Sequence, residues 1–132
     1  MLNNFPAGFQ DLLTDDARAF AYLATVMPDN TPQVTPVWFD TDGKYLRVNS
    51  ARGRVKDRNM RKRPQVTLVI ADPKNPYRYV QVRGTVIEFT QEGAAEHIDA
   101  LAKKYTGADR YPNARDDRVI NKIKIEKTQS MG

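Results

Sequence analysis

The stretch YLRVNSARGRVKDRNM, residues 45–60, decides the fold of this chain. Its first residues alternate as in a half-buried strand, and its last six begin a helix that we expect to run from Val55 to Arg63, where Pro64 ends it. Seven bases and a single acid, Asp57, fall within residues 52–63, a net charge of +6 in twelve residues. The whole chain carries only +5, so its basic character is concentrated at this one junction of strand and helix.

The basic side chains at this junction stand where a helix least favours cations. Arg52, Arg54 and Lys56 lie at or just before the helix N-terminus, whose unsatisfied N–H groups carry about half a positive charge. Each cation there is unfavourable by about 0.3–1 kcal/mol, and a bound anion would relieve that repulsion. Ser50 and Asn59 can add a hydroxyl and an amide donor. The segment therefore predicts a phosphate site.

Two other interpretations of the basic segment stay open. The same composition is found on solvated basic surfaces and on nucleic-acid contacts. The nucleic-acid interpretation is disfavoured because aromatic residues do not alternate with the basic residues and no binding motif of that class is present. We therefore expect no nucleic-acid partner.

Outward from this segment, the sequence predicts strands joined by short turns. Asp42-Gly43 is a hairpin turn, Pro36 suits a bulge or an edge strand, and Gly84 marks a kink or bulge in a long strand. Residues 128–132 are expected to fray. Strands are expected at 19–27, 33–39, 44–49, 65–71, 77–90 and 118–127, with helices at 5–16 and 92–105. This order predicts a mainly β fold, an antiparallel barrel of about six strands with flanking helices.

Length and composition limit the possible classes. A chain of 132 residues is expected to form a single domain, residues 1–132. No apolar run is long enough to span a bilayer, and the start lacks the basic and apolar regions of a signal peptide, so we expect a cytoplasmic protein without a membrane partner. There is no cysteine and only one histidine, so we expect no metal site. No glycine-rich nucleotide motif is present.

The ordered set of strands and basic loop resembles the pyridoxamine 5'-phosphate oxidase-like split-barrel flavoproteins. The resemblance covers the chain from about Ala21 to Lys127. Its most specific part is Lys56-Asp-Arg-Asn-Met60 followed by Arg61-Lys-Arg-Pro64. Within the family, the chain is most similar to the branch that uses the deazaflavin coenzyme F420.

The resemblance implies a homodimer with two cofactor sites at the subunit interface, where a small-molecule substrate also binds. It implies that the cofactor ring, its ribityl chain and its phosphate contact successive groups of residues. The implied groups are Thr35, Pro36 and Val37 at the ring, Val48, Asn49 and Ser50 along the ribityl chain, Arg54, Lys56 and Asn59 at the phosphate, and Tyr77 and Tyr79 approaching the cofactor from this chain or its partner.

Two cofactors fit these expectations, and we favour coenzyme F420 over flavin mononucleotide (FMN). Coenzyme F420 continues beyond its phosphate into an acidic tail, which suits the additional bases Arg52, Arg58, Arg61 and Lys62. FMN oxidases of the superfamily are expected to carry an Arg-Lys pair directly after the strand serine, where this chain has Ala51. The expected activity is hydride transfer to a small organic acceptor. An FMN flavoprotein and a cofactor-binding protein without turnover are the alternatives.

No residue of the chain is expected to be catalytic, because the cofactor supplies the chemistry. His97 is placed off the apolar stripe of its helix and is expected to be exposed. Trp38 lies on an alternating strand and is expected in the core, with stacking on a ring as the alternative. Tyr105 and Tyr111 flank a loop that either covers the site or packs in the ordinary way.

Overall fold

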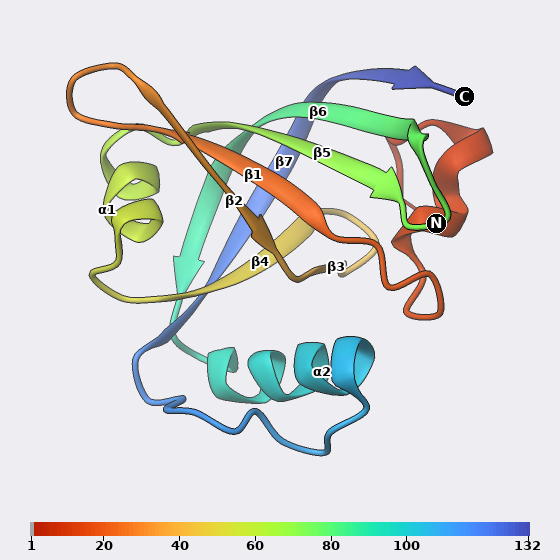
Figure 1. Cartoon of the computed structure of the whole chain (residues 1–132). Helices are drawn as coiled ribbons and strands as arrows, with labels where there is room; N and C mark the ends of the chain where they lie inside the picture. The colour runs from red at the N-terminus through yellow and green to blue at the C-terminus, as the bar shows by residue number, and fades with distance from the viewer. Residues whose placement is uncertain (1) are drawn as a thin grey trace.

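The structure is a computed structural model that describes residues 2–132. The described residues form seven strands, two α-helices and one short 3-10 helix (Figure 1). In chain order the elements are η1 (Ala7–Leu13), β1 (Ala21–Val26), β2 (Pro32–Val37), β3 (Phe39–Thr41), β4 (Leu46–Ala51), α1 (Val55–Lys62), β5 (Gln65–Asp72), β6 (Asn75–Thr90), α2 (Ala94–Thr106) and β7 (Arg118–Met131).

All seven strands belong to one antiparallel sheet with the order β2-β1-β5-β6-β7-β4-β3. The sheet curls on itself, with α1 at one end of the curl and α2 below it (Figure 1). This confirms the predicted mainly β split barrel. The expected strand 33–39 is interrupted at Trp38, so that β2 and β3 form the two opposite edges of the sheet. Pro36 lies in edge strand β2, the position in a sheet where proline is tolerated.

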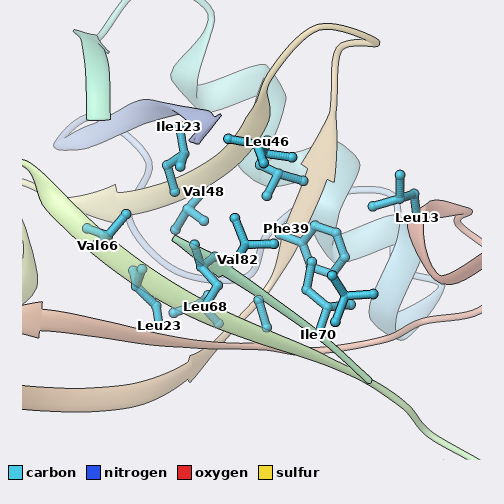
Figure 2. Close-up of a cluster of buried hydrophobic side chains, with 14 of the residues drawn as sticks. Leu13, Leu23, Phe39, Leu46, Val48, Val66, Leu68, Ile70, Val82 and Ile123 are labelled. Atoms are coloured by element: carbon cyan, nitrogen blue, oxygen red, sulfur yellow. The ribbon is translucent and has the colours of Figure 1, made fainter. Parts of the chain in front are cut away.

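The core fills the inside of the curled sheet. Alternate residues of β1 point inward, and Ala21, Leu23 and Thr25 are buried while Tyr22 between them is exposed. Figure 2 shows the inward side chains of several strands meeting one another. The strand residues labelled there are Leu23, Phe39, Leu46, Val48, Val66, Leu68, Ile70, Val82 and Ile123, and Leu13 of η1 joins them.

Strand β6 is the longest element and pairs with β5 on one side and β7 on the other. Its register against β7 shifts between Arg83 and Gly84, which confirms the irregularity predicted at that glycine. A Cβ atom on Gly84 would lie 2.4 Å from the carbonyl oxygen of Lys124. Only glycine therefore lets the two backbones approach this closely.

Contrary to the prediction from the sequence, the C-terminal residues do not fray. Strand β7 continues to Met131, and Gln129, Ser130 and Met131 pair with Gln81, Val80 and Tyr79 of β6. On the edge of β6 opposite β5, the backbone groups of its first half need hydrogen-bond partners, and the last part of β7 supplies them. The expectation for residues 128–132 was wrong because alternation of apolar residues ends at Ile125 while the backbone pairing continues.

The two α-helices lie at the ends of strands that build the candidate site. Helix α1 follows β4 after a three-residue turn in which Gly53 has a φ of +83°, and its bounds confirm the predicted helix within one residue. Helix α2 contacts β4 and β7, and its buried residues include Ala94, Ile98 and Leu101. Among residues 2–132, no helix combines the length and apolar character that crossing a membrane requires.

Candidate functional site

A cleft opens where β2, β4, the start of α1, helix α2 and the start of β7 meet. Its volume is about 230 Å³. The lining residues are Pro36, Val37, Trp38, Asn49, Arg54, Lys56, Ile98, Tyr111 and Arg118.

Three cations and no carboxylate line this cleft. Arg54 and Lys56 come from the basic segment, and Arg118 is brought beside them because Ala51 of β4 pairs with Arg118 of β7. None of the three forms a salt bridge with any residue between 2 and 132. Burial, followed by the charges of Arg54 and Arg118, lowers the pKa of Lys56 below its ordinary value. The cleft is therefore a cationic site that an anion would stabilise.

The one acid of the basic segment does not neutralise the cleft. Asp57 is buried, and its Oδ2 accepts a hydrogen bond from the Gly53 backbone N–H at 2.9 Å. Its Oδ1 is 3.1 Å from Nε of Arg61. Asp57 thus fixes the turn into α1 and binds a base one helical turn further on. Arg61 is consequently not one of the free additional bases that the sequence suggested.

Aromatic side chains also line the cleft. The ring of Trp38 stacks on Tyr105 at 5.4 Å with an interplanar angle of 8° and meets Tyr111 edge-on at 6.2 Å. Trp38 is only partly buried and lines the cleft, so its expected place in the core was wrong. Tyr105 is anchored behind it, because its hydroxyl donates to the carbonyl of Ala19 at 2.6 Å.

The expectation that His97 is exposed was also wrong. His97 is 5% exposed, with Nε2 3.0 Å from Oδ1 of Asp40 and Nδ1 3.1 Å from Nδ2 of Asn49. Arg47 clamps the same carboxylate through two hydrogen bonds of 2.9 and 2.8 Å. Burial alone would raise the pKa of Asp40, but the hydrogen bonds from His97 and Arg47 outweigh it and lower that pKa.

The predicted site residues divide into three groups. Pro36, Val37, Asn49, Arg54 and Lys56 line the cleft together. Arg118 also lines the cleft but was not predicted, because it lies 62 residues after Lys56 and only the pairing of β4 with β7 brings it there.

A second group of predicted residues lies beside the cleft without lining it. Val48 is a core residue, and Ser50 is buried with its hydroxyl accepting from Asn121 at 2.9 Å. Thr35 precedes the cleft on β2, and its Oγ1 is buried without a partner among the described residues.

The third group lies away from the cleft. Asn59 is 2% exposed and points into the barrel wall, where its Nδ2 donates to Oγ1 of Thr25 at 2.9 Å. A phosphate contact by Asn59 would require this bond to break. Tyr77 and Tyr79 occupy the far half of β6, where Tyr79 pairs with Met131. Within one chain they do not reach the cleft residues.

A larger hollow of about 500 Å³ lies over β1, β5 and β6. Arg83 and Lys127 line it together with Glu126, whose carboxylate also accepts a hydrogen bond from Thr85 at 2.7 Å. Most of its other lining residues are apolar or uncharged, including Ala24, Val26 and Val66. Because an acid accompanies the bases there, the smaller cleft is the better anion site.

The fold and the cleft together define a class, a small split barrel with a cationic, aromatic-walled binding site. The sequence profile described as pyridoxamine 5'-phosphate oxidase matches residues 9–132, and the chain belongs to that family. A solved F420 reductase is 36% identical, with a TM-score of 0.84 over 95% of this chain and 98% of that one. The resemblance found in the sequence is confirmed at the level of the family.

More distant similarities show the fold alone. A conserved hypothetical protein from Mycobacterium tuberculosis is 22% identical with a TM-score of 0.73, over 96% of this chain and 84% of that one. The heme storage protein HutZ from Vibrio cholerae is 14% identical with a TM-score of 0.68, over 95% of this chain and 93% of that one. A curated relative, a DNA ligase from Stenotrophomonas maltophilia, is 26% identical over 121 residues. That match takes in 89% of this chain and only 14% of the ligase's length.

Proposed function

We propose that this protein binds coenzyme F420 in the cationic cleft and transfers hydride between it and a small organic acceptor. The observation that carries the proposal is the convergence of Arg54, Lys56 and Arg118 without an acidic partner among the described residues. A phosphate bound there would take charge-assisted hydrogen bonds from all three. The similarity to an F420 reductase supports the same cofactor.

The residues present fit a phosphorylated cofactor with a flat ring. Nε of Arg118 and Oδ1 of Asn49 are buried without hydrogen-bond partners among residues 2–132, and such atoms are costly unless a ligand satisfies them. Pro36, Val37 and Trp38 supply an apolar side to the same cleft. When bound, the deazaflavin ring would supply the hydride chemistry. The side chains of this protein bind its phosphate, orient it and limit access of water.

Coenzyme F420 is favoured over FMN by charge beyond the three cleft cations. Arg52, Lys62 and Arg58 are exposed and form no salt bridge with the described residues, and the Arg58 side chain donates a hydrogen bond to the Gly53 carbonyl. These three bases exceed what one phosphate monoester requires and suit an acidic tail. FMN remains the alternative cofactor, and the titration described below distinguishes them.

The cleft of one chain is smaller than a complete cofactor site. Ligand sites commonly enclose about 300–1,000 Å³, whereas this cleft holds about 230 Å³. The outer face of β1 and β2 beside it is apolar and exposed, since Tyr22 pairs with Pro36 and Ala24 with Val34 on that face. We propose that a second copy of the chain covers this face and completes the site.

The dimer proposal is tested at the same surface. Val34 is 61% exposed, so Val34→Glu should leave the fold intact while placing a charge in the covered face. Sedimentation velocity should show a dimer for the unaltered protein and for Val34→Ile, and a monomer for Val34→Glu. A monomer in all three would contradict the proposal.

The cofactor is tested by titration of the purified protein. Trp38 is the sole tryptophan and lines the cleft, so its fluorescence reports occupancy directly. We expect quenching by coenzyme F420 at lower concentration than by FMN. Tighter binding of FMN would reverse the preference, and no quenching by either would remove the site.

Turnover is a separate question from binding. Reduced cofactor bound to the protein should be reoxidised faster than free reduced cofactor when small organic acceptors are added under anaerobic conditions. Absorbance of the oxidised cofactor follows the rate in a stopped-flow instrument. Equal rates with and without the protein, across a set of acceptors, would support a binding protein without turnover.

A further inference from the structure

A chain of three polar side chains runs from the edge of the sheet to the cleft. It links Asp40 of β3, His97 of α2 and Asn49 of β4. His97 and Asn49 are 5% and 8% exposed, and Asn49 alone of the three lines the cleft. Since Asn49 and His97 are 48 positions apart in the sequence, the contact is made by the fold and not by local structure.

A backbone carbonyl fixes the direction of every hydrogen bond in this chain. The amide of Asn49 lies 2.9 Å from the carbonyl oxygen of Ala94, which can only accept. The atom facing it is therefore Nδ2, and the second hydrogen of Nδ2 points to Nδ1 of His97 at 3.1 Å. Nδ1 must then accept, so in the neutral ring the proton is on Nε2, where Asp40 accepts it at 3.0 Å.

This direction leaves one atom without a partner. With Nδ2 of Asn49 bonded to Ala94 and His97, Oδ1 is buried and has no hydrogen-bond partner among residues 2–132. A buried acceptor left unsatisfied costs about 1–3 kcal/mol. A ligand in the cleft that brings a hydrogen-bond donor to this atom would recover that cost.

We propose that His97 is a positioning residue that holds the amide of Asn49 so that Oδ1 accepts a hydrogen bond from a hydroxyl of the bound cofactor. The proposal rests on the proposed function, because it assigns a partner to the polyol chain between ring and phosphate. This arrangement of His97 and Asn49 makes the site selective for a ligand that carries a hydroxyl donor between its flat ring and its phosphate. Asp40, held by Arg47, sets the tautomer of His97, and the carbonyl of Ala94 sets the orientation of the Asn49 amide.

The tautomer is measured first, in the free protein. His97 is the sole histidine, so a long-range ¹H–¹⁵N spectrum contains the signals of one ring. We expect the neutral ring to carry its proton on Nε2 and none on Nδ1. A proton on Nδ1 would overturn the proposal, because two donors would then face each other between His97 and Asn49. This measurement does not depend on any cofactor.

The coupling to the cofactor is measured with two matched variants. His97→Asn places a carbonyl oxygen near the position of Nδ1 and can still accept from Asn49, whereas His97→Phe keeps an aromatic ring and cannot. We expect His97→Phe to weaken cofactor binding about 2- to 12-fold, the value of one neutral hydrogen bond, and His97→Asn to restore most of it. Equal losses in both variants would indicate a merely structural role and overturn the proposal.

Two further comparisons separate this proposal from the proposed function. Inorganic pyrophosphate has no polyol chain, so its affinity for the cationic cleft should be unchanged in His97→Phe. In an Asn49→Ala background, the effect of His97→Phe on cofactor affinity should disappear, because His97 acts through Asn49. An additive effect would overturn the proposal. If the unaltered protein binds pyrophosphate but no cofactor, the proposed function fails while the tautomer result stands.

Discussion

The guanidinium of Arg118 lies over the ring of Tyr111 at 4.7 Å, and its Nη2 donates a hydrogen bond to the Tyr111 hydroxyl at 2.9 Å. The loop between α2 and β7 is thereby bound to the first residue of β7. Tyr111 also packs edge-on against Trp38, so one tyrosine connects the cationic side of the cleft with its aromatic side. The loop that the sequence left between two interpretations therefore forms a wall of the cleft.

Arg118→Met should weaken binding of pyrophosphate and of the cofactor. Loss of a charge-assisted contact costs about 1.5–3 kcal/mol, which corresponds to a 10- to 150-fold rise in the dissociation constant measured by calorimetry. Tyr111→Phe is the matched control, because it keeps the ring under Arg118 and removes only the hydroxyl. It should have a smaller effect. Unaltered affinity in Arg118→Met would exclude Arg118 from the anion site.

Lys56→Ala should weaken the binding of pyrophosphate and of the cofactor by a comparable factor, about 10- to 150-fold, for the same reason. Lys62→Ala serves as the control, since Lys62 is an exposed lysine of the same helix that does not line the cleft. Its removal should change the dissociation constant for pyrophosphate by no more than about twofold relative to the unaltered protein. Equal effects of the two substitutions would point to general attraction by a basic surface, without a specific site.

Binding of an anion should decrease at alkaline pH because of Lys56. Burial and the neighbouring Arg54 and Arg118 lower its pKa in the free protein, and a bound anion favours the charged form and raises it. Between these two pKa values, binding takes up protons, so affinity decreases as pH rises. Calorimetry in two buffers of different ionisation enthalpy measures the uptake. Lys56→Arg should abolish it in this range, and identical uptake in both proteins would assign the proton to another group.

Gly84→Ala should destabilise the barrel, whereas Gly8→Ala should not. A Cβ at position 84 would meet the Lys124 carbonyl oxygen at 2.4 Å, while at position 8 nothing lies within 4 Å. Forcing β6 and β7 apart should lower the free energy of unfolding by roughly 1–3 kcal/mol, measured by urea denaturation. Equal stability of the two variants would show that the strands separate there without cost.

The sequence predicted the strands, the helix after the basic segment and the family, because these follow from local alternation and local charge. It missed the burial of His97, although the signal was present. His97 lies three residues after Ala94 and four before Leu101, both buried, so it belongs to the inward stripe of α2. A polar residue on that stripe was read as exposed because its partners Asp40 and Asn49 lie on distant strands.

Other site residues could not be predicted from local patterns. The family resemblance assigns Asn59 to the phosphate together with Lys56, but its amide donates to Thr25 in the barrel wall. Arg118 was not proposed because nothing near it in the sequence indicates a ligand. The register between β4 and β7 places it opposite Ala51, and register across many intervening residues is a property of the whole sheet.

The pairing of Ala51 with Arg118 also sets the order of events in biosynthesis. Arg54 and Lys56 leave the ribosome long before Arg118, and until β7 has emerged and joined β4 the cleft lacks its third cation and the loop that carries Tyr111. A nascent chain at that stage exposes cations without the enclosure that would retain a cofactor. A ligand that needs all three cations would therefore bind only after β7 has paired with β4, so that closing the barrel and completing the cleft are one step.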